Sequence, residues 1–267
     1  MLNNGKHNII GILIHAVNYN VAVDHIVQAA HERRPMAVSA LAVHGLMTGV
    51  LDSEHKYRLN QFDLLVPDGQ PVRWALNVLH GTKLRDRVYG PNLMLHVCSR
   101  AEEEGLGIFL YGSTPDVLYE LRENLQNRFP ALRIAAMEPS KFRPLSPEEK
   151  AELIVRIRNS GAAMVFVGLG SPRQEIWAYE LREVLSMPLL AVGAAFPFLA
   201  GKIRQAPKWM QDRGLEWLFR LIVEPRRLWR RYLFLSPAYV LLVSLQALGI
   251  ARFTTGGNPP SAELSYG

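Results

Sequence analysis

The chain has 267 residues, 49% hydrophobic and 20% charged, which is ordinary for a folded protein long enough to bury a large core. Its single cysteine, Cys98, excludes an internal disulfide framework and any zinc or iron–sulfur site built from several cysteines. The net charge of +6 is local: residues 202–231 carry nine Lys or Arg and three Asp or Glu, so the rest of the chain is neutral. The polar N-terminus and the short apolar run after it do not resemble a secretory signal, and we expect a cytoplasmic chain.

Short apolar runs alternate with helical patterns along most of the chain. The expected strands are residues 8–14, 36–41, 62–66, 106–111, 133–137, 163–167 and 188–192. The expected helices are residues 21–33, 42–51, 53–59, 71–79, 92–104, 115–129, 146–159 and 173–185. Thr114 supplies a capping hydroxyl, and Ser146 with Glu149 a capping box. This alternation predicts a Rossmann-like α/β fold, with a largely parallel sheet covered by helices.

The predicted domains are a core, an appendage and a tail. The α/β core covers residues 1–201, and two Rossmann-like halves, at about 1–104 and 105–201, are one option within it. Residues 202–253 are expected to form a basic, Trp-rich helical appendage that associates with a membrane, and residues 254–267 a disordered tail. The apolar run 233–250 approaches the length of a spanning helix, but Pro237 and two serines favour an interfacial or partly inserted helix. A helix buried against the core is the alternative.

The stretch from Leu65 to Pro71 places a carboxylate on a glycine turn directly after the expected strand 62–66. Loops at the carboxyl ends of parallel strands line the ligand crevice, so Asp68 and Gly69 are candidate site residues. The basic loop 81–91 supplies Arg85 and Arg87, which suit bidentate contacts with a diphosphate. Locally, a tight Pro-Asp-Gly turn and a solvated loop explain the same residues.

Two glycine turns each join an expected strand to a helix N-terminus, where backbone N–H groups favour a diphosphate. The first contains Gly112 and the second Gly168 and Gly170, followed by Gln174 and Glu175, which could read a base or a ribose. Neither turn matches the dinucleotide fingerprint or a Walker A loop, and any α/β fold needs such turns. No Asp-X-Asp triplet occurs and the histidines show no metal-ligand spacing, so we predict neither a metal nor another cofactor.

The arginines of the appendage allow three interpretations: nucleic-acid binding, a solvated helix face, or contact with anionic lipid. Trp209, Trp217 and Trp229 lie between them and an apolar run follows, which favours the lipid surface. The candidates for membrane or acceptor contacts are Arg220, Arg226, Arg227, Arg230 and Arg231.

Several motifs follow one another in a fixed order. They are Val66-Pro67-Asp68-Gly69, Arg87-Val88-Tyr89-Gly90-Pro91, Val167 to Glu175, Val192 to Phe196, Leu199-Ala200-Gly201, Gly214 to Leu221 and Glu224 to Arg227. Singly these motifs are modest, but their ordered set is highly specific. Over about residues 8–232 the chain resembles the WecG/TagA/CpsF glycosyltransferase family.

The resemblance implies an inverting, metal-independent transfer of a hexose or N-acetylhexosamine from a UDP-sugar to a polyprenyl-diphosphate-linked saccharide. The expected place is the cytoplasmic face of a bacterial plasma membrane, in surface polysaccharide synthesis, with the protein peripheral or partly inserted. The resemblance also implies Asp68 as general base, Arg87 near the donor sugar and diphosphate, and Gln174 on the nucleotide side. A homo-oligomer is compatible with it.

The sequence departs from the family pattern on the donor side. The family's Thr-X-Asn reads Ser39-Ala40-Leu41 here, which keeps a hydroxyl at Ser39 and loses the asparagine. Pro197 replaces an aspartate in the Phe-Asp-X-X-Ala-Gly motif. The donor sugar, the acceptor saccharide and the linkage therefore stay open.

Two other classes of function are rivals. A nicotinamide-dependent oxidoreductase fits the alternating pattern, but the third glycine and the acidic ribose partner are missing. A nucleic-acid-binding protein fits the basic appendage, but the neutral core and the apolar run suit lipid better, and we expect no nucleic-acid partner.

Overall fold

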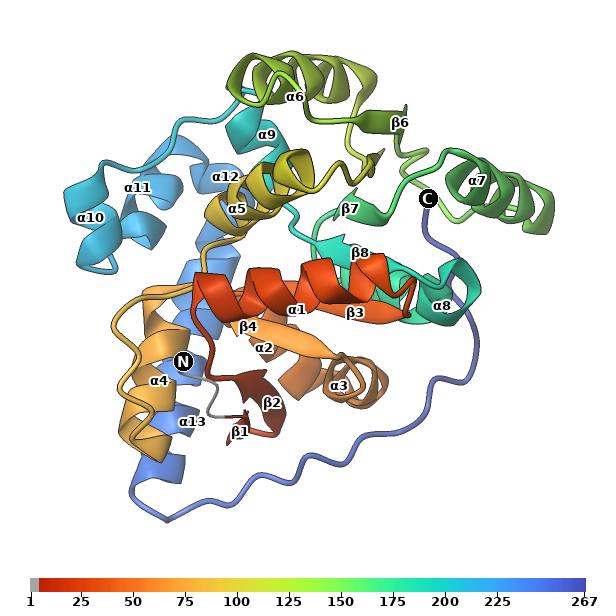
Figure 1. The fold of residues 1–267 in the computed structure, drawn as a ribbon. Helices are drawn as coiled ribbons and strands as arrows, with labels where there is room; N and C mark the ends of the chain where they lie inside the picture. The colour runs from red at the N-terminus through yellow and green to blue at the C-terminus, as the bar shows by residue number, and fades with distance from the viewer. Residues whose placement is uncertain (1–4) are drawn as a thin grey trace.

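The computed structural model describes residues 5–267, the side chains of Arg227, Arg230 and Arg231 excepted. At its centre is a six-stranded sheet in the order β4-β3-β8-β7-β5-β6, in which every neighbouring pair is parallel (Figure 1). The strands are β3 (Met36–Leu41), β4 (Leu64–Pro67), β5 (Ile108–Gly112), β6 (Ile134–Glu138), β7 (Met164–Gly168) and β8 (Pro188–Ala191). The predicted Rossmann-like α/β fold is confirmed. Because β8 pairs with both β3 and β7, the two halves considered above share one sheet.

Alternate side chains of the strands point to opposite faces of the sheet, and each face has its own buried cluster. Val38, Leu110 and Phe166 belong to the first cluster, while their neighbours Ala37 and Phe109 belong to the second. The first face is covered by α1 (Tyr19–His31), α5 (Gly90–Glu103), α6 (Pro115–Arg128) and α9 (Ala195–Leu199). The second is covered by α2 (Val43–Leu51), α3 (Ser53–Asn60), α4 (Gln70–His80), α7 (Pro147–Asn159) and α8 (Arg173–Leu185). Burial on both faces explains why the strands read as continuous apolar runs.

Residues 8–14, expected as one strand, instead form parts of an antiparallel hairpin, so that prediction is wrong. Its arms are β1 (Lys6–Ile9) and β2 (Ile12–His15), which form a separate two-stranded sheet. Ile10 (φ 42°) and Gly11 (φ 94°) between them both have left-handed backbone conformations. A two-residue turn with positive φ at both positions matches the twist of the paired strands. The sequence does not reveal this turn, because Ile10 continues the apolar pattern of a strand.

The two predicted helix caps differ in outcome. Ser146 and Glu149 form the full capping box at the start of α7, as predicted. Thr114 does precede α6, but its hydroxyl contacts the carboxylate of Asp116 and caps no backbone N–H. An acid in the first helical turn therefore competes for the hydroxyl that was expected to cap.

The C-terminal helices lie against the core. They are α10 (Lys208–Asp212), α11 (Glu216–Val223), α12 (Pro225–Arg230), a π-helical turn η1 (Arg231–Leu235) and α13 (Ser236–Ala247). Within the apolar run 233–250, α13 packs on α2 and α4, and the buried Tyr239 donates its hydroxyl to the Pro71 carbonyl (3.1 Å). Val240 and Leu241, on the other side of the helix, are exposed. Among the described residues, no helix has the length and apolar character needed to cross a bilayer.

Residues 254–267, expected as a disordered tail, run in an extended conformation along the surface from the end of α13 to the loop after β6 (Figure 1). Asn60 of α3 donates to the Thr255 carbonyl (2.7 Å). The Glu180 carboxylate of α8 accepts from the backbone N–H groups of Leu264 (2.7 Å) and Ser265 (3.0 Å). The segment thus contacts elements that lie far apart in the sequence.

Candidate active site

Asp68 lies where the sequence analysis expects it, at the carboxyl end of β4. Its backbone N–H donates to the Leu41 carbonyl at the end of the neighbouring β3 (3.2 Å), which ties the two strand ends together. Gly69 follows with φ 143°, a conformation that side chains with a Cβ rarely adopt, and α4 begins at the next residue. The glycine therefore lets the chain turn sharply between β4 and α4, and the Asp68 carboxylate accepts from the Gly90 N–H at the start of α5.

The loop of residues 81–91 returns to the same place. The Val88 N–H donates to the Pro67 carbonyl (2.9 Å), and Gly90 begins α5 with its N–H hydrogen bonded to the Asp68 carboxylate. A Cβ added at Gly90 would lie 3.3 Å from the Ala40 Cβ and 3.5 Å from Asp68 Oδ2. Glycine at this position therefore allows the helix N-terminus to approach the carboxylate closely.

The electrostatic setting of Asp68 suits a proton acceptor. Burial, with a smaller contribution from the Glu216 carboxylate, raises the pKa of Asp68 to about 7 against the opposing effects of Arg87, Arg220 and the Gly90 N–H. Asp68 as a whole residue is half-buried, between the buried strand β4 and the N-terminus of α5. A general base works best when its pKa is near the working pH, and this carboxyl group meets that condition near neutrality.

Arg87 is buried, acts electrostatically on Asp68 and forms an ion pair with Glu216. Its Nη2 donates to Glu216 Oε2 (2.7 Å) and to Gln211 Oε1 (3.1 Å), both from the appendage. Its guanidinium lies over the Tyr89 ring, 4.3 Å from the ring centroid, and the Tyr89 hydroxyl donates to Glu216 Oε1 (3.2 Å). Helices α10 and α11 therefore lie over this site. The Glu216 carboxylate of α11 contacts two side chains of the 81–91 loop, Arg87 and Tyr89.

The junction between α10 and α11 is fitted tightly to the core. Gly214 has φ 71°, and a Cβ added there would lie 2.6 Å from the Trp74 ring and 3.4 Å from the Gln70 Cβ. Both neighbours belong to the first turns of α4, directly after Asp68. The glycine of the Gly214 to Leu221 motif is therefore the point at which the appendage packs over the site.

Arg220, predicted as a membrane or acceptor residue, lies on the site side of α11. Its guanidinium lies 5.3 Å from the centroid of the Phe198 ring, and its charge acts on Asp68. Its Nε is buried without a hydrogen-bond partner among the described residues. Arg226 is exposed, while the side chains of Arg227, Arg230 and Arg231 lie outside the described part.

Arg85 is not brought to Asp68. Its side chain is exposed, and its backbone carbonyl accepts from Arg73 Nη1 (2.7 Å). No hydrogen bond or ion pair between described residues joins Arg85 to Asp68 or Arg87. Of the two arginines predicted from this loop, the structure therefore brings only Arg87 to the carboxylate.

A second polar cluster lies at the carboxyl ends of β3 and β7. Ser39 Oγ (3.0 Å) and Gln174 Nε2 (2.9 Å) both donate to Glu175 Oε1, and the Gly170 N–H donates to Gln174 Oε1 (3.2 Å). All three side chains are buried, and burial raises the pKa of the Glu175 carboxyl. The structure thus brings Ser39 to three predicted site residues, Gly170, Gln174 and Glu175, that lie more than 130 positions later in the sequence.

The glycine turns are explained in part by packing. A Cβ at Gly112 (φ 105°) would lie 2.8 Å from the Gly168 carbonyl carbon, and one at Gly168 would lie 2.5 Å from the Phe196 ring. Gly170 has φ 78° and open space around it. Gly112 and Gly168 therefore keep two adjacent strand ends close together, and Gly170 is the one with room for a ligand.

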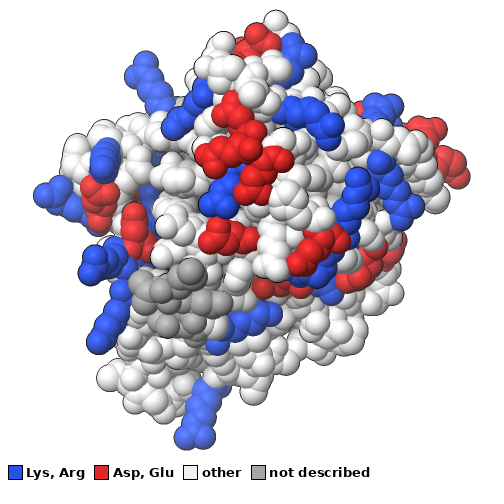
Figure 2. All heavy atoms as spheres, in the orientation of Figure 1, with Lys and Arg blue, Asp and Glu red and all other residues white. Residues whose placement is uncertain are grey.

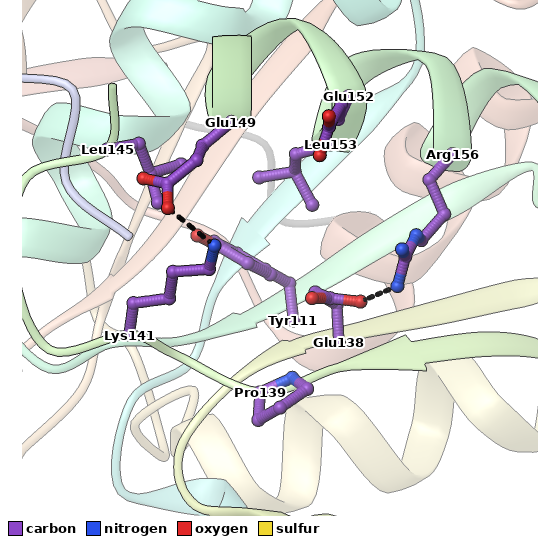
Figure 3. A pocket seen from close by; sticks show the side chains of 9 residues that line it. All are labelled: Tyr111, Glu138, Pro139, Lys141, Leu145, Glu149, Glu152, Leu153 and Arg156. Atoms are coloured by element: carbon purple, nitrogen blue, oxygen red, sulfur yellow. Dashed lines mark hydrogen bonds and ion pairs between the residues drawn. The ribbon is translucent and has the colours of Figure 1, made fainter. Parts of the chain in front are cut away.

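Other candidate locations are less suited to chemistry. A hollow of about 80 Å³ lies between β6 and α7, and four of its five charged lining residues form two ion pairs, Lys141 with Glu149 and Arg156 with Glu138 (Figure 3). None of the predicted site residues lines it. Within residues 5–267, no three His, Cys, Asp or Glu side chains gather as metal ligands would.

Glu216 and Tyr89 are functional-site candidates that sequence reasoning missed. Both stand within the quoted motifs, but neither was given a role. A signal was present for Glu216, because it is the only acid between Arg213 and Arg220 in a helix that is otherwise apolar and basic. An acid placed there needs a cationic partner, and the structure supplies Arg87.

The fold and the site agree with a comparison against known protein families. Residues 7–252, nearly the whole chain, match the sequence profile described as the Glycosyl transferase WecG/TagA/CpsF family. This match covers the sheet, both polar clusters and the helices up to the end of α13. It supports the glycosyltransferase interpretation over the oxidoreductase one. The chain belongs to the WecG/TagA/CpsF family and is a glycosyltransferase.

Proposed function

We propose that the protein transfers a hexose or N-acetylhexosamine from a UDP-sugar to a polyprenyl-diphosphate-linked saccharide, with inversion and without a metal ion. Asp68 takes the proton of the acceptor hydroxyl, whose oxygen then attacks the anomeric carbon. The bond from that carbon to the UDP oxygen breaks, and UDP leaves. A single displacement of this kind inverts the anomeric configuration.

The observation that carries this proposal is that Arg87, held by a helix of the appendage, acts electrostatically on Asp68. Asp68 has a pKa of about 7, and Arg87 and Arg220 both act electrostatically on it. One group can therefore accept a proton at neutral pH while two cations balance the charge that develops on a departing diphosphate. The buried cluster of Ser39, Gln174 and Glu175 is the proposed nucleotide side of the site.

The proposed location is the cytoplasmic face of the plasma membrane, reached through the appendage. Trp209 (54% exposed) of α10, Ile222 (69%) of α11 and Phe234 (64%) of η1 turn apolar surface outward, and α10 and α11 contact Arg87 through Gln211 and Glu216. Lys and Arg side chains also project from the edge of the molecule where α10 and α11 lie (Figure 2). Aromatic and basic side chains together are typical of an interfacial helix on anionic lipid.

The test is a panel of UDP-sugars incubated with a synthetic polyprenyl-diphosphate-linked sugar, with release of UDP as the readout. We expect one or a few donors to give turnover that persists in EDTA, and the product to have the inverted anomeric configuration by NMR. Asp68→Asn should abolish most turnover while UDP binding remains. Unchanged turnover in this variant, with an intact fold by circular dichroism, would remove Asp68 as base.

A further inference from the structure

Glu216 neutralises the cation that the proposed function needs for its leaving group. Its Oε2 lies 2.7 Å from Arg87 Nη2, and the two side chains are only 13% and 8% exposed, respectively. The Tyr89 hydroxyl donates to its other oxygen (3.2 Å), so both carboxylate oxygens are engaged. A carboxylate and a phosphate place their oxygens alike toward a guanidinium, and both are bound by the same donors.

Two carboxyl groups, Asp68 and Glu216, and two guanidinium groups, Arg87 and Arg220, meet in the site, so the cations are matched before any diphosphate enters. Asp68 and Glu216 both act electrostatically on Arg87, and Arg220 is the second cation that acts on Asp68. A diphosphate entering this space would add negative charge beside Glu216 and Asp68 that these two cations do not balance. The least costly arrangement releases Glu216, because it comes from the appendage and not from the sheet.

We propose that Glu216 is a positioning residue that substitutes for the diphosphate in the ligand-free protein and is displaced when a diphosphate binds Arg87. The inference rests on the proposed function only in taking that diphosphate to be the one of a nucleotide-sugar donor. Displacement of Glu216 also shifts α11, which carries Arg220 on its site side. Binding of a diphosphate at Arg87 would thereby change the position of α11 and of Arg220.

The test measures binding of inorganic pyrophosphate by isothermal titration calorimetry at constant ionic strength. Glu216→Gln keeps the shape of the side chain and removes the competing charge, so pyrophosphate should bind roughly tenfold more tightly, or about 1.4 kcal/mol. Asp212→Asn is the matched control, because it removes one negative charge from the exposed end of α10. It should change the dissociation constant less than about twofold.

A milder variant keeps the proposal testable if Glu216→Gln does not fold. Tyr89→Phe removes one hydrogen bond to Glu216 and keeps the ring over Arg87, so it should tighten pyrophosphate binding in the same direction by a smaller factor. Unchanged or weaker binding in Glu216→Gln overturns the proposal, as does an equal gain in Asp212→Asn. If Glu216→Gln is unfolded, the absence of a gain in Tyr89→Phe overturns it.

The proposed function is tested by a separate measurement. UDP-sugar turnover is measured on the same preparations of wild-type protein. A tenfold gain in pyrophosphate affinity without turnover of any donor supports the role of Glu216 and contradicts the proposed substrates. Turnover of a donor without a gain in pyrophosphate affinity supports the proposed substrates and contradicts the role of Glu216. That role is also overturned if neither the wild type nor the variants bind pyrophosphate.

Discussion

Replacing Asp68 with Asn should stabilise the folded protein by an amount that depends on pH. Raising the carboxyl pKa from 3.8 to about 7 corresponds to a cost on the order of 4 kcal/mol for holding the ionised form in the fold. The unfolded chain ionises above pH 3.8, whereas the folded chain keeps the proton until about pH 7. Wild-type stability therefore falls as the pH rises between these values, and Asp68→Asn lacks this loss.

The measurement is urea unfolding of wild type and Asp68→Asn at pH 5 and pH 8. The gain from the substitution should be about 3 kcal/mol larger at pH 8 than at pH 5, as an upper limit because the neighbouring charges can rearrange. Asp212→Asn, which alters an exposed carboxylate, should show no comparable difference. An equal gain at both pH values would refute the inference that Asp68 keeps its proton in the fold up to neutral pH.

Three further predictions concern activity, packing and membrane contact. The kcat/KM of the wild type should rise about tenfold per pH unit up to about pH 7 and then level off, because Asp68 must be ionised to accept a proton. A pH–rate profile that is flat from pH 5 to pH 8 would contradict this. Gly168→Ala places a Cβ against the Phe196 ring and should cost about 1–3 kcal/mol in thermal unfolding, whereas Gly256→Ala, with nothing within 4 Å, should cost far less. Membrane contact is tested by neutralising four arginines together, Arg226, Arg227, Arg230 and Arg231, which should weaken binding to anionic vesicles by roughly 4 kcal/mol. Co-sedimentation measures the binding, with neutral vesicles as the control. Unchanged binding would exclude these residues from the membrane contact.

Most of the parallel sheet could be predicted from the sequence because each strand is buried on both faces. Such strands are short apolar runs between helical patterns, and runs such as Met164–Gly168 have no competing interpretation. The hairpin at residues 6–15 could not be predicted in the same way, because Ile10 adopts the left-handed conformation without a glycine of its own. Composition likewise suggested disorder for residues 254–267, while hydrogen bonds to α3 and α8 come from partners distant in the chain.

The site was predictable where its residues lie in the two loops that flank one helix, α4, and unpredictable where they come from elements distant in the sequence. Asp68 and Arg87 each follow a recognisable local pattern, and their proximity depends on one strand end and the helix that follows. The contact of Arg87 with Glu216 joins residues 129 positions apart, and no spacing rule connects them. Arg85 shows the converse, because it shares the charge and the loop of Arg87 but points to solvent.

The position of β8 between β3 and β7 has a consequence for how the chain folds. The edge of β3 that pairs with β8 stays open until residues 188–191 leave the ribosome, more than half the chain after β3 itself. Contacts of such long sequence separation form slowly, and an unpaired strand edge can recruit other chains meanwhile. Synthesis of this protein therefore includes a long interval in which its N-terminal strands have an exposed edge, and chaperones or rapid translation would protect it then.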